Sequence, residues 1–168
     1  MKKISLTLLM MILIIVTTFS VMACTMNNEL SSEEDATDSS TTEETVTATL
    51  MLADKFTNVV FTITTETTAS YLSDFMDQIV ADADNEVSYE ADDTGYGLYM
   101  STFTVSGVTY GSASNQYPMM YTTITDENYL YAGYTTTIGQ VTYNSCGLGM
   151  SGMPIEDGVT YVIVIEEY

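Results

Sequence analysis

Residues 70–83 read SYLSDFMDQIVADA, and here the hydrophobic pattern of the chain changes from alternation to a helical repeat. Its apolar residues recur at the spacing of one face of a helix, as Tyr71, Leu72, Phe75, Met76, Ile79 and Val80. Ser70 is a suitable N-cap, and Asp74 suits the positive end of the helix dipole. The stretch therefore predicts one amphipathic helix with a face to bury.

The segments on both sides of this helix have the composition and the alternation of strands. We expect strands at residues 46–52, 59–64, 98–105, 118–125, 129–137 and 159–166. Two strands, one helix and then several strands predict an α+β fold, a mixed sheet crossed by one helix, and this order fits a β-grasp. Residues 46–168 are enough for one domain with one core.

The N-terminus has the plan of a secretory signal peptide. Two lysines precede a mostly apolar run at residues 4–16, and polar residues then lower the hydrophobicity before Ala23 and Cys24. Residues 21–24, VMAC, resemble the bacterial lipobox, in which the cysteine receives diacylglycerol and becomes the new N-terminus. We expect a signal peptide at residues 1–23 and a lipidated Cys24 that anchors the chain to the outer side of the cell membrane. The alternative is an uncleaved transmembrane anchor, because the apolar run approaches the ~20 residues that a span requires.

Residues 24–45 are expected to be a disordered linker. Of the 21 residues after Cys24, 9 are Ser or Thr and 7 are Asp or Glu. Such a segment buries too little apolar surface to offset the entropy of ordering it.

The charge of the chain excludes some partners. It has 23 acidic and 3 basic residues, for a net charge of −20. This charge repels phosphate backbones, so we expect no nucleic-acid partner. It favours solubility and cationic partners, including metal ions.

The cysteine and histidine counts restrict the chemistry. If Cys24 is lipidated, Cys146 is left without a partner, and we expect it to be buried as a small hydrophobe. The chain has no histidine, which excludes a Ser-His-Asp triad, a Cys-His pair and the usual zinc sites. Residues 147–152 spell the GxGxxG pattern, but no helix is expected after them, so we interpret them as a surface loop. The acidic residues at 82–86 and 92–93 are interpreted as flanking a solvated loop, not a calcium site. We therefore predict that the protein is not an enzyme and holds no resident metal.

Three stretches carry a resemblance to a known family. They are GYGLYMSTFTVSGV at residues 95–108, YPMMYTT at 117–123 and MPIEDGVTYVIVIEEY at 153–168. With the expected hairpin and helix before them, they make residues 46–168 resemble the DUF4430 family. That domain is similar to the C-terminal β-domain of transcobalamin and intrinsic factor. The resemblance implies a β-grasp domain that covers one face of a ligand, with a corrinoid as the implied ligand and no cofactor otherwise.

An aromatic and thioether-rich run provides the candidate binding residues. We select Tyr117, Met119, Tyr121, Tyr143 and Cys146, because Tyr and Met offer a large adaptable contact surface. The run also contains Met120, Tyr129, Tyr131 and Tyr134. Half of these residues are also expected to face the core through strand alternation. The expected function is a cell-surface lipoprotein that binds a small molecule for uptake. The alternative is a surface-displayed adhesion or protein-interaction module.

Overall fold

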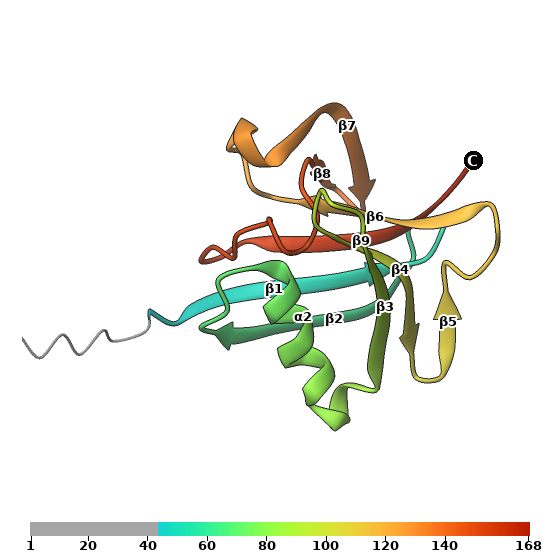
Figure 1. Ribbon diagram of the computed structural model, residues 1–168, viewed down its shortest axis with the longest axis horizontal. Helices are drawn as coiled ribbons and strands as arrows, with labels where there is room; N and C mark the ends of the chain where they lie inside the picture. Colours follow the sequence, from blue (N-terminus) through green and yellow to red (C-terminus); the bar gives the residue numbers. More distant parts are fainter. Residues whose placement is uncertain (1–43) are drawn as a thin grey trace, which may run out of the picture. The chain divides into compact units, whose positions relative to one another are not determined.

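The computed structural model describes residues 44–168 (Figure 1). The expected signal peptide, the lipidated Cys24 and residues 24–43 of the expected linker lie outside the described residues. No helix within residues 44–168 is long and apolar enough to cross a membrane.

The larger of two sheets has six strands in the order β2-β1-β9-β6-β8-β7. These strands are β1 (Val46–Ala53), β2 (Val59–Thr67), β6 (Gln116–Thr122), β7 (Leu130–Ile138), β8 (Val141–Cys146) and β9 (Thr160–Glu167). β1 and β9 run parallel at the centre, while the other neighbours are antiparallel. The sheet is therefore mixed, and the strand nearest the N-terminus of the domain pairs with its last strand.

The smaller sheet has three antiparallel strands in the order β3-β4-β5. They are β3 (Val87–Asp93), β4 (Leu98–Val105) and β5 (Val108–Tyr110). One α-helix, α2 (Leu72–Ala81), crosses the six-stranded sheet beside β3 (Figure 1). Two short 3₁₀ helices, η1 (Ala83–Asn85) and η2 (Glu127–Tyr129), precede β3 and β7. The described part is thus mostly β-sheet with one α-helix, which confirms the α+β class.

The main core lies between the six-stranded sheet, α2 and the smaller sheet. Leu50 pairs with Tyr161 and Leu52 with Ile163, so strand alternation points all four side chains to one side. They are 0% exposed and pack with the helix residues Leu72, Phe75, Met76 and Ile79. The amphipathic helix is therefore confirmed by the side that it buries.

The opposite side of the sheet carries a second, smaller apolar cluster. Its buried members are Ala53, Tyr121, Tyr143, Val162 and Val164, with Met51, Met119 and Ile138 packed against them. The six-stranded sheet is therefore apolar on both sides near its centre.

The helix begins at Leu72, one residue later than predicted, and its N-cap is Tyr71 rather than Ser70. Residues 70–71 are drawn into extended backbone, because Tyr71 bridges to Pro154 and the Ser70 carbonyl accepts from the Ile155 N–H. The Leu72 N–H donates to the Met153 carbonyl, and the Ser73 N–H to the Met150 carbonyl. A loop that is remote in sequence therefore satisfies the helix start, and no side-chain cap is used.

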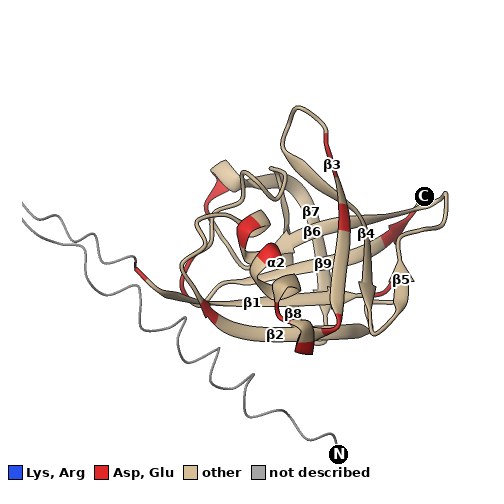
Figure 2. Ribbon diagram, turned by 60° about the horizontal axis from the view of Figure 1, so that its bottom comes forward, with Lys and Arg blue, Asp and Glu red and all other residues tan. Residues whose placement is uncertain are grey.

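The loop that we expected between the acidic residues 82–86 and 92–93 is wrong, because residues 87–93 form β3. Val87, Tyr89 and Ala91 face the core, while Ser88, Glu90 and Asp92 face solvent. Acidic residues therefore occupy exposed positions of a strand, and Figure 2 marks acidic positions along β3 in red. β8 also lies in a stretch for which no strand was expected.

Candidate functional site

Three of the predicted site residues lie on one face of β6. Tyr117 pairs with Glu166, Met119 with Val164 and Tyr121 with Val162. Alternate residues of a strand point the same way, so these three side chains share the side opposite α2. Tyr143 of β8 joins them, because it packs with Tyr121 in the second apolar cluster.

Tyr121 and Tyr143 are each only 5% exposed, and they form the base of this surface. The Tyr121 hydroxyl donates to the Glu166 carboxylate at 2.8 Å. Burial and this hydrogen bond to an anion raise the pKa of the Tyr121 phenol. These two tyrosines would support a ligand on this face from below rather than present their faces to it.

Tyr117 and Met119 lie beside Tyr121 along β6, on the same side of the sheet. Tyr117 is 40% exposed, and its ring centroid lies 5.8 Å from that of Tyr168 at the C-terminus. Met119 is half-buried against the second cluster. Met51 of β1, on the far side of β9, is half-buried against the same cluster. We call Tyr117, Met119, Met51 and Tyr168 the tyrosine–methionine face.

Cys146 does not belong to this face. Its side chain is half-buried and packs against the main core, on the other side of the sheet. Burial raises the pKa of the Cys146 thiol to about 12. The thiol is therefore protonated at neutral pH, and its position is that of a packing residue.

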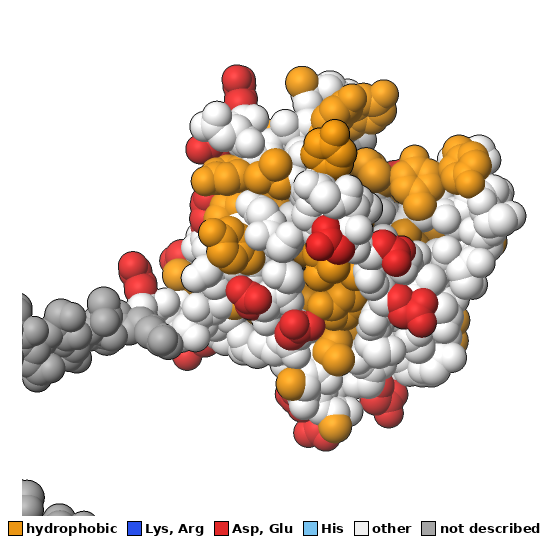
Figure 3. Space-filling model, viewed as in Figure 1, with side chains coloured by type: hydrophobic (Ala, Val, Ile, Leu, Met, Phe, Trp, Pro, Cys, Tyr) orange, Lys and Arg blue, Asp and Glu red, His pale blue; other side chains and the backbone are white. Residues whose placement is uncertain are grey.

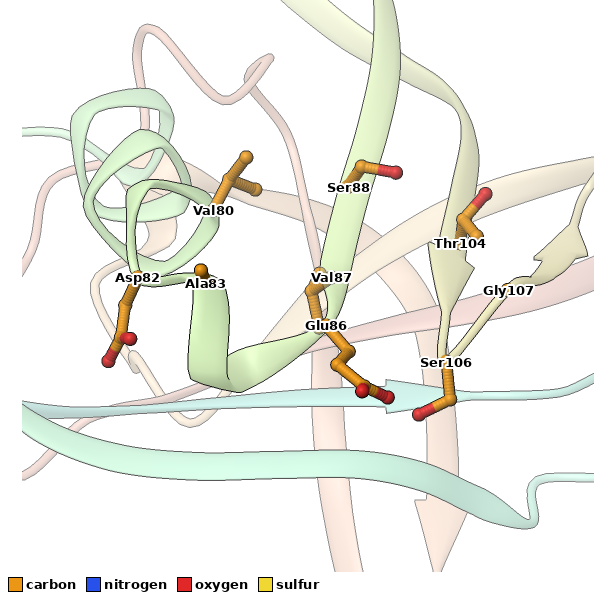
Figure 4. A pocket seen from close by; sticks show the side chains of 9 residues that line it. All are labelled: Val80, Asp82, Ala83, Glu86, Val87, Ser88, Thr104, Ser106 and Gly107. Carbon is orange, nitrogen blue, oxygen red and sulfur yellow. The ribbon is translucent and has the colours of Figure 1, made fainter. Parts of the chain in front are cut away.

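An acidic groove of about 520 Å³ lies between the end of α2 and strands β3 and β4 (Figure 4). Val80, Ala83 and Val87 provide its apolar part, and Asp82 and Glu86 provide its carboxylates. The Asp82 carboxylate accepts the Asp84 N–H at 3.1 Å, so it caps η1. Within residues 44–168, no three Asp, Glu, Cys or His side chains gather in a way that could hold a metal ion.

A second hollow, of about 450 Å³, lies along β7 and has exposed tyrosines as its walls. It is lined by Glu127, Leu130, Tyr131, Ala132, Gly133, Tyr134, Thr135 and Asn144, and we call it the tyrosine hollow. Tyr131 and Tyr134 are 61% and 60% exposed, with ring centroids 5.4 Å apart and ring planes at 50°. Figure 3 shows apolar side chains gathered over β7 at the top of the view.

A bulge in β7 creates this hollow. Leu130 pairs with Cys146 and Thr135 with Asn144, so the four residues 131–134 of β7 lie opposite the single residue Ser145 of β8. Gly133 has φ of +88°, a conformation that a residue with a Cβ rarely adopts. The two tyrosines stood in the aromatic run but not among the selected residues. The signal that marks them is the glycine between two tyrosines in an otherwise regular strand.

Comparisons with known proteins find similarity to solved structures only. No family model matches the chain, and no curated protein matches it. A proposed metal-binding protein from Ruminococcus gnavus ATCC 29149 is similar in structure, with a TM-score of 0.44 and 19% identity over 73% of this chain and 98% of that one. Haptocorrin in complex with cobinamide (Cbi) is similar with a TM-score of 0.48 and 11% identity, over 75% of this chain and 26% of haptocorrin.

Proposed function

We propose that this protein is a membrane-anchored binding protein of the cell surface, not an enzyme. Its domain, residues 46–168, is a β-grasp like that of the family which its sequence resembles. Its ligand is a corrinoid or a similar flat small molecule. The arrangement of β2, β1, β9 and β6 around a parallel central pair, crossed by one helix, supports the β-grasp. The lipobox-like residues 21–24 support the anchor at Cys24.

The single observation that carries the ligand proposal is the tyrosine–methionine face. β6 presents an aromatic ring and a thioether on the same side of the sheet as the buried rings of Tyr121 and Tyr143. A flat macrocycle gains contact from such a surface because aromatic rings offer a large apolar area and thioethers are polarisable and adaptable. The protein covers one side of such a ligand, so moderate affinity is expected.

Calorimetric titration of soluble residues 46–168 with cobalamin and with cobinamide tests this function. We expect micromolar or tighter binding that Tyr117→Ala and Met119→Ala weaken. Tyr96→Ala is the matched control, because Tyr96 is 85% exposed in the β3–β4 connection and lines none of the surfaces above. Absence of heat with both corrinoids, from folded protein, would refute the ligand and favour an adhesion or protein-interaction module.

The anchor has its own test. Metabolic labelling of bacteria with radioactive palmitate should label the wild-type chain and not Cys24→Ala. Labelling that persists in Cys24→Ala, or an unlabelled wild-type chain that stays in the membrane fraction at full precursor size, would contradict the lipid anchor.

A further inference from the structure

We propose that the tyrosine hollow is a second binding site, which takes an organic ammonium ion. The hollow lies at the opposite end of β6 from Tyr117. Asn144 pairs with Thr122, five residues along the strand, which is roughly 17 Å at the rise of a β-strand. Asn144 also points away from the side that Tyr143 faces, because the two are consecutive in β8. The two sites are therefore separate.

The walls of the hollow suit a cation. Tyr131 and Tyr134 form a wedge of two rings at 50°, whose faces carry the negative part of the ring quadrupole. Both rings are well exposed, so they are reachable from solvent. An ammonium group placed over such rings is attracted electrostatically, and more strongly when it is partly desolvated. The apolar side chains of Leu130 and Ala132 beside them suit the carbon groups of an alkylated ammonium.

The polar groups of the hollow are acceptors. Within residues 44–168 the one ion pair joins Lys55 to Glu167, so the Glu127 carboxylate pairs with no base. Asn144 uses its amide N–H to hold the Ile124 carbonyl at 3.1 Å, which leaves its oxygen for a donor. One free carboxylate and an amide oxygen beside two ring faces attract a positive charge.

The charge of the domain adds to this preference. Residues 44–168 contain 17 acidic residues and one basic residue, Lys55. Lys55 lies away from the hollow and pairs with Glu167 at 2.7 Å. No basic residue of the described part lines the hollow or neutralises Glu127. A field of one sign raises the local concentration of small ions of the opposite sign.

The test is ligand-observed saturation-transfer NMR on the full chain in non-ionic detergent. Choline is the probe, and 3,3-dimethylbutan-1-ol, which replaces its nitrogen with carbon, is the uncharged control. We expect choline to bind in the millimolar range and the alcohol to bind at least about fivefold more weakly. Raising the salt concentration should weaken choline binding. Equal binding of choline and the alcohol, or no binding of choline, would overturn the proposal.

Variants separate the contributions within the site. Tyr131→Phe and Tyr134→Phe keep the ring and should retain binding. Tyr131→Leu and Tyr134→Leu keep apolar volume without the ring, and each should weaken binding roughly two- to fivefold. Glu127→Gln should weaken it by a similar factor at low salt. Tyr96→Ala should have no effect, so an equal loss in Tyr96→Ala, or full binding in both Leu variants, counts against the site.

Discussion

Replacing Gly149 with alanine should destabilise the domain more than replacing Gly152 with alanine does. A Cβ at Gly149 would lie 2.9 Å from the carbonyl carbon of Gly97 and 2.9 Å from the Leu98 oxygen. These are backbone atoms at the start of β4, and they cannot rotate away. Ordinary contact begins near 3.4 Å, so one backbone must retreat by about 0.5 Å.

The displacement would act on a specific hydrogen bond. The Met150 N–H donates to the same Leu98 carbonyl at 2.7 Å, and the Met150 side chain is 0% exposed. Overpacking of this kind costs about 1–3 kcal/mol. Gly152→Ala is the matched control, because its Cβ would meet the Leu148 side chain at 3.3 Å rather than backbone, and its φ is not positive. Any gain from a less flexible unfolded chain applies to both variants, so it cancels in their difference.

Urea unfolding followed by circular dichroism measures both variants. We expect the free energy of unfolding of Gly149→Ala to fall by about 1–3 kcal/mol, with little change in the denaturant slope. Gly152→Ala should lose less than about 1 kcal/mol. If the two variants unfold at the same urea concentration, close backbone contact is not the reason for the glycine at 149.

Three further outcomes are expected. Asp54→Ala should lower the free energy of unfolding by about 1 kcal/mol, because the Asp54 carboxylate accepts hydrogen bonds from the N–H groups of residues 56 and 58 in the β1–β2 turn. An unchanged midpoint of thermal or urea unfolding would show that this turn needs no side-chain cap. Cys146 should react with Ellman's reagent at pH 8 far more slowly than free cysteine, since burial raises its pKa to about 12, and a rapid reaction in the folded protein would contradict its packing against the core. Ser145→Ala should leave stability unchanged or raise it by up to about 1 kcal/mol, because the Ser145 hydroxyl is buried without a hydrogen-bond partner within the described residues. Tyr161→Phe should instead lower stability by about 1–2 kcal/mol, because it loses the 2.6 Å hydrogen bond to the Pro154 carbonyl. Equal unfolding midpoints for the two variants would contradict this contrast.

The spacing of apolar residues in the sequence predicts the helices and strands that bury one side only. The helix and the β1–β2 hairpin follow from the sequence because their apolar positions repeat at the period of the element that they form. β3 does not, because Glu90, Asp92 and Asp93 dominate its composition while Val87 and Tyr89 carry its inward face. β8 is short and adjoins glycines, which hide its alternation.

Site residues depend on long-range register, which a single sequence does not contain. Tyr121, Tyr131, Tyr134 and Tyr143 are the same residue type in similar surroundings, yet two are buried and two are exposed. The pairing of β6 with β9 buries Tyr121, and the bulge of β7 exposes Tyr131 and Tyr134. A one-residue change in either register would turn these side chains to the opposite side of the sheet.

The parallel pairing of β1 with β9 also constrains the order in which the domain can form. During synthesis β1 appears first and β9 last, and about a hundred residues separate the strands that pair at the centre of the sheet. Until β9 is available, β1 and β6 lack their shared neighbour, and the main core lacks Tyr161, Ile163 and Ile165. Closing so long a loop late makes folding slow relative to a helical protein of the same size. For the export that we propose, this delay would be an advantage, because the sheet cannot be completed before the last strand has been made.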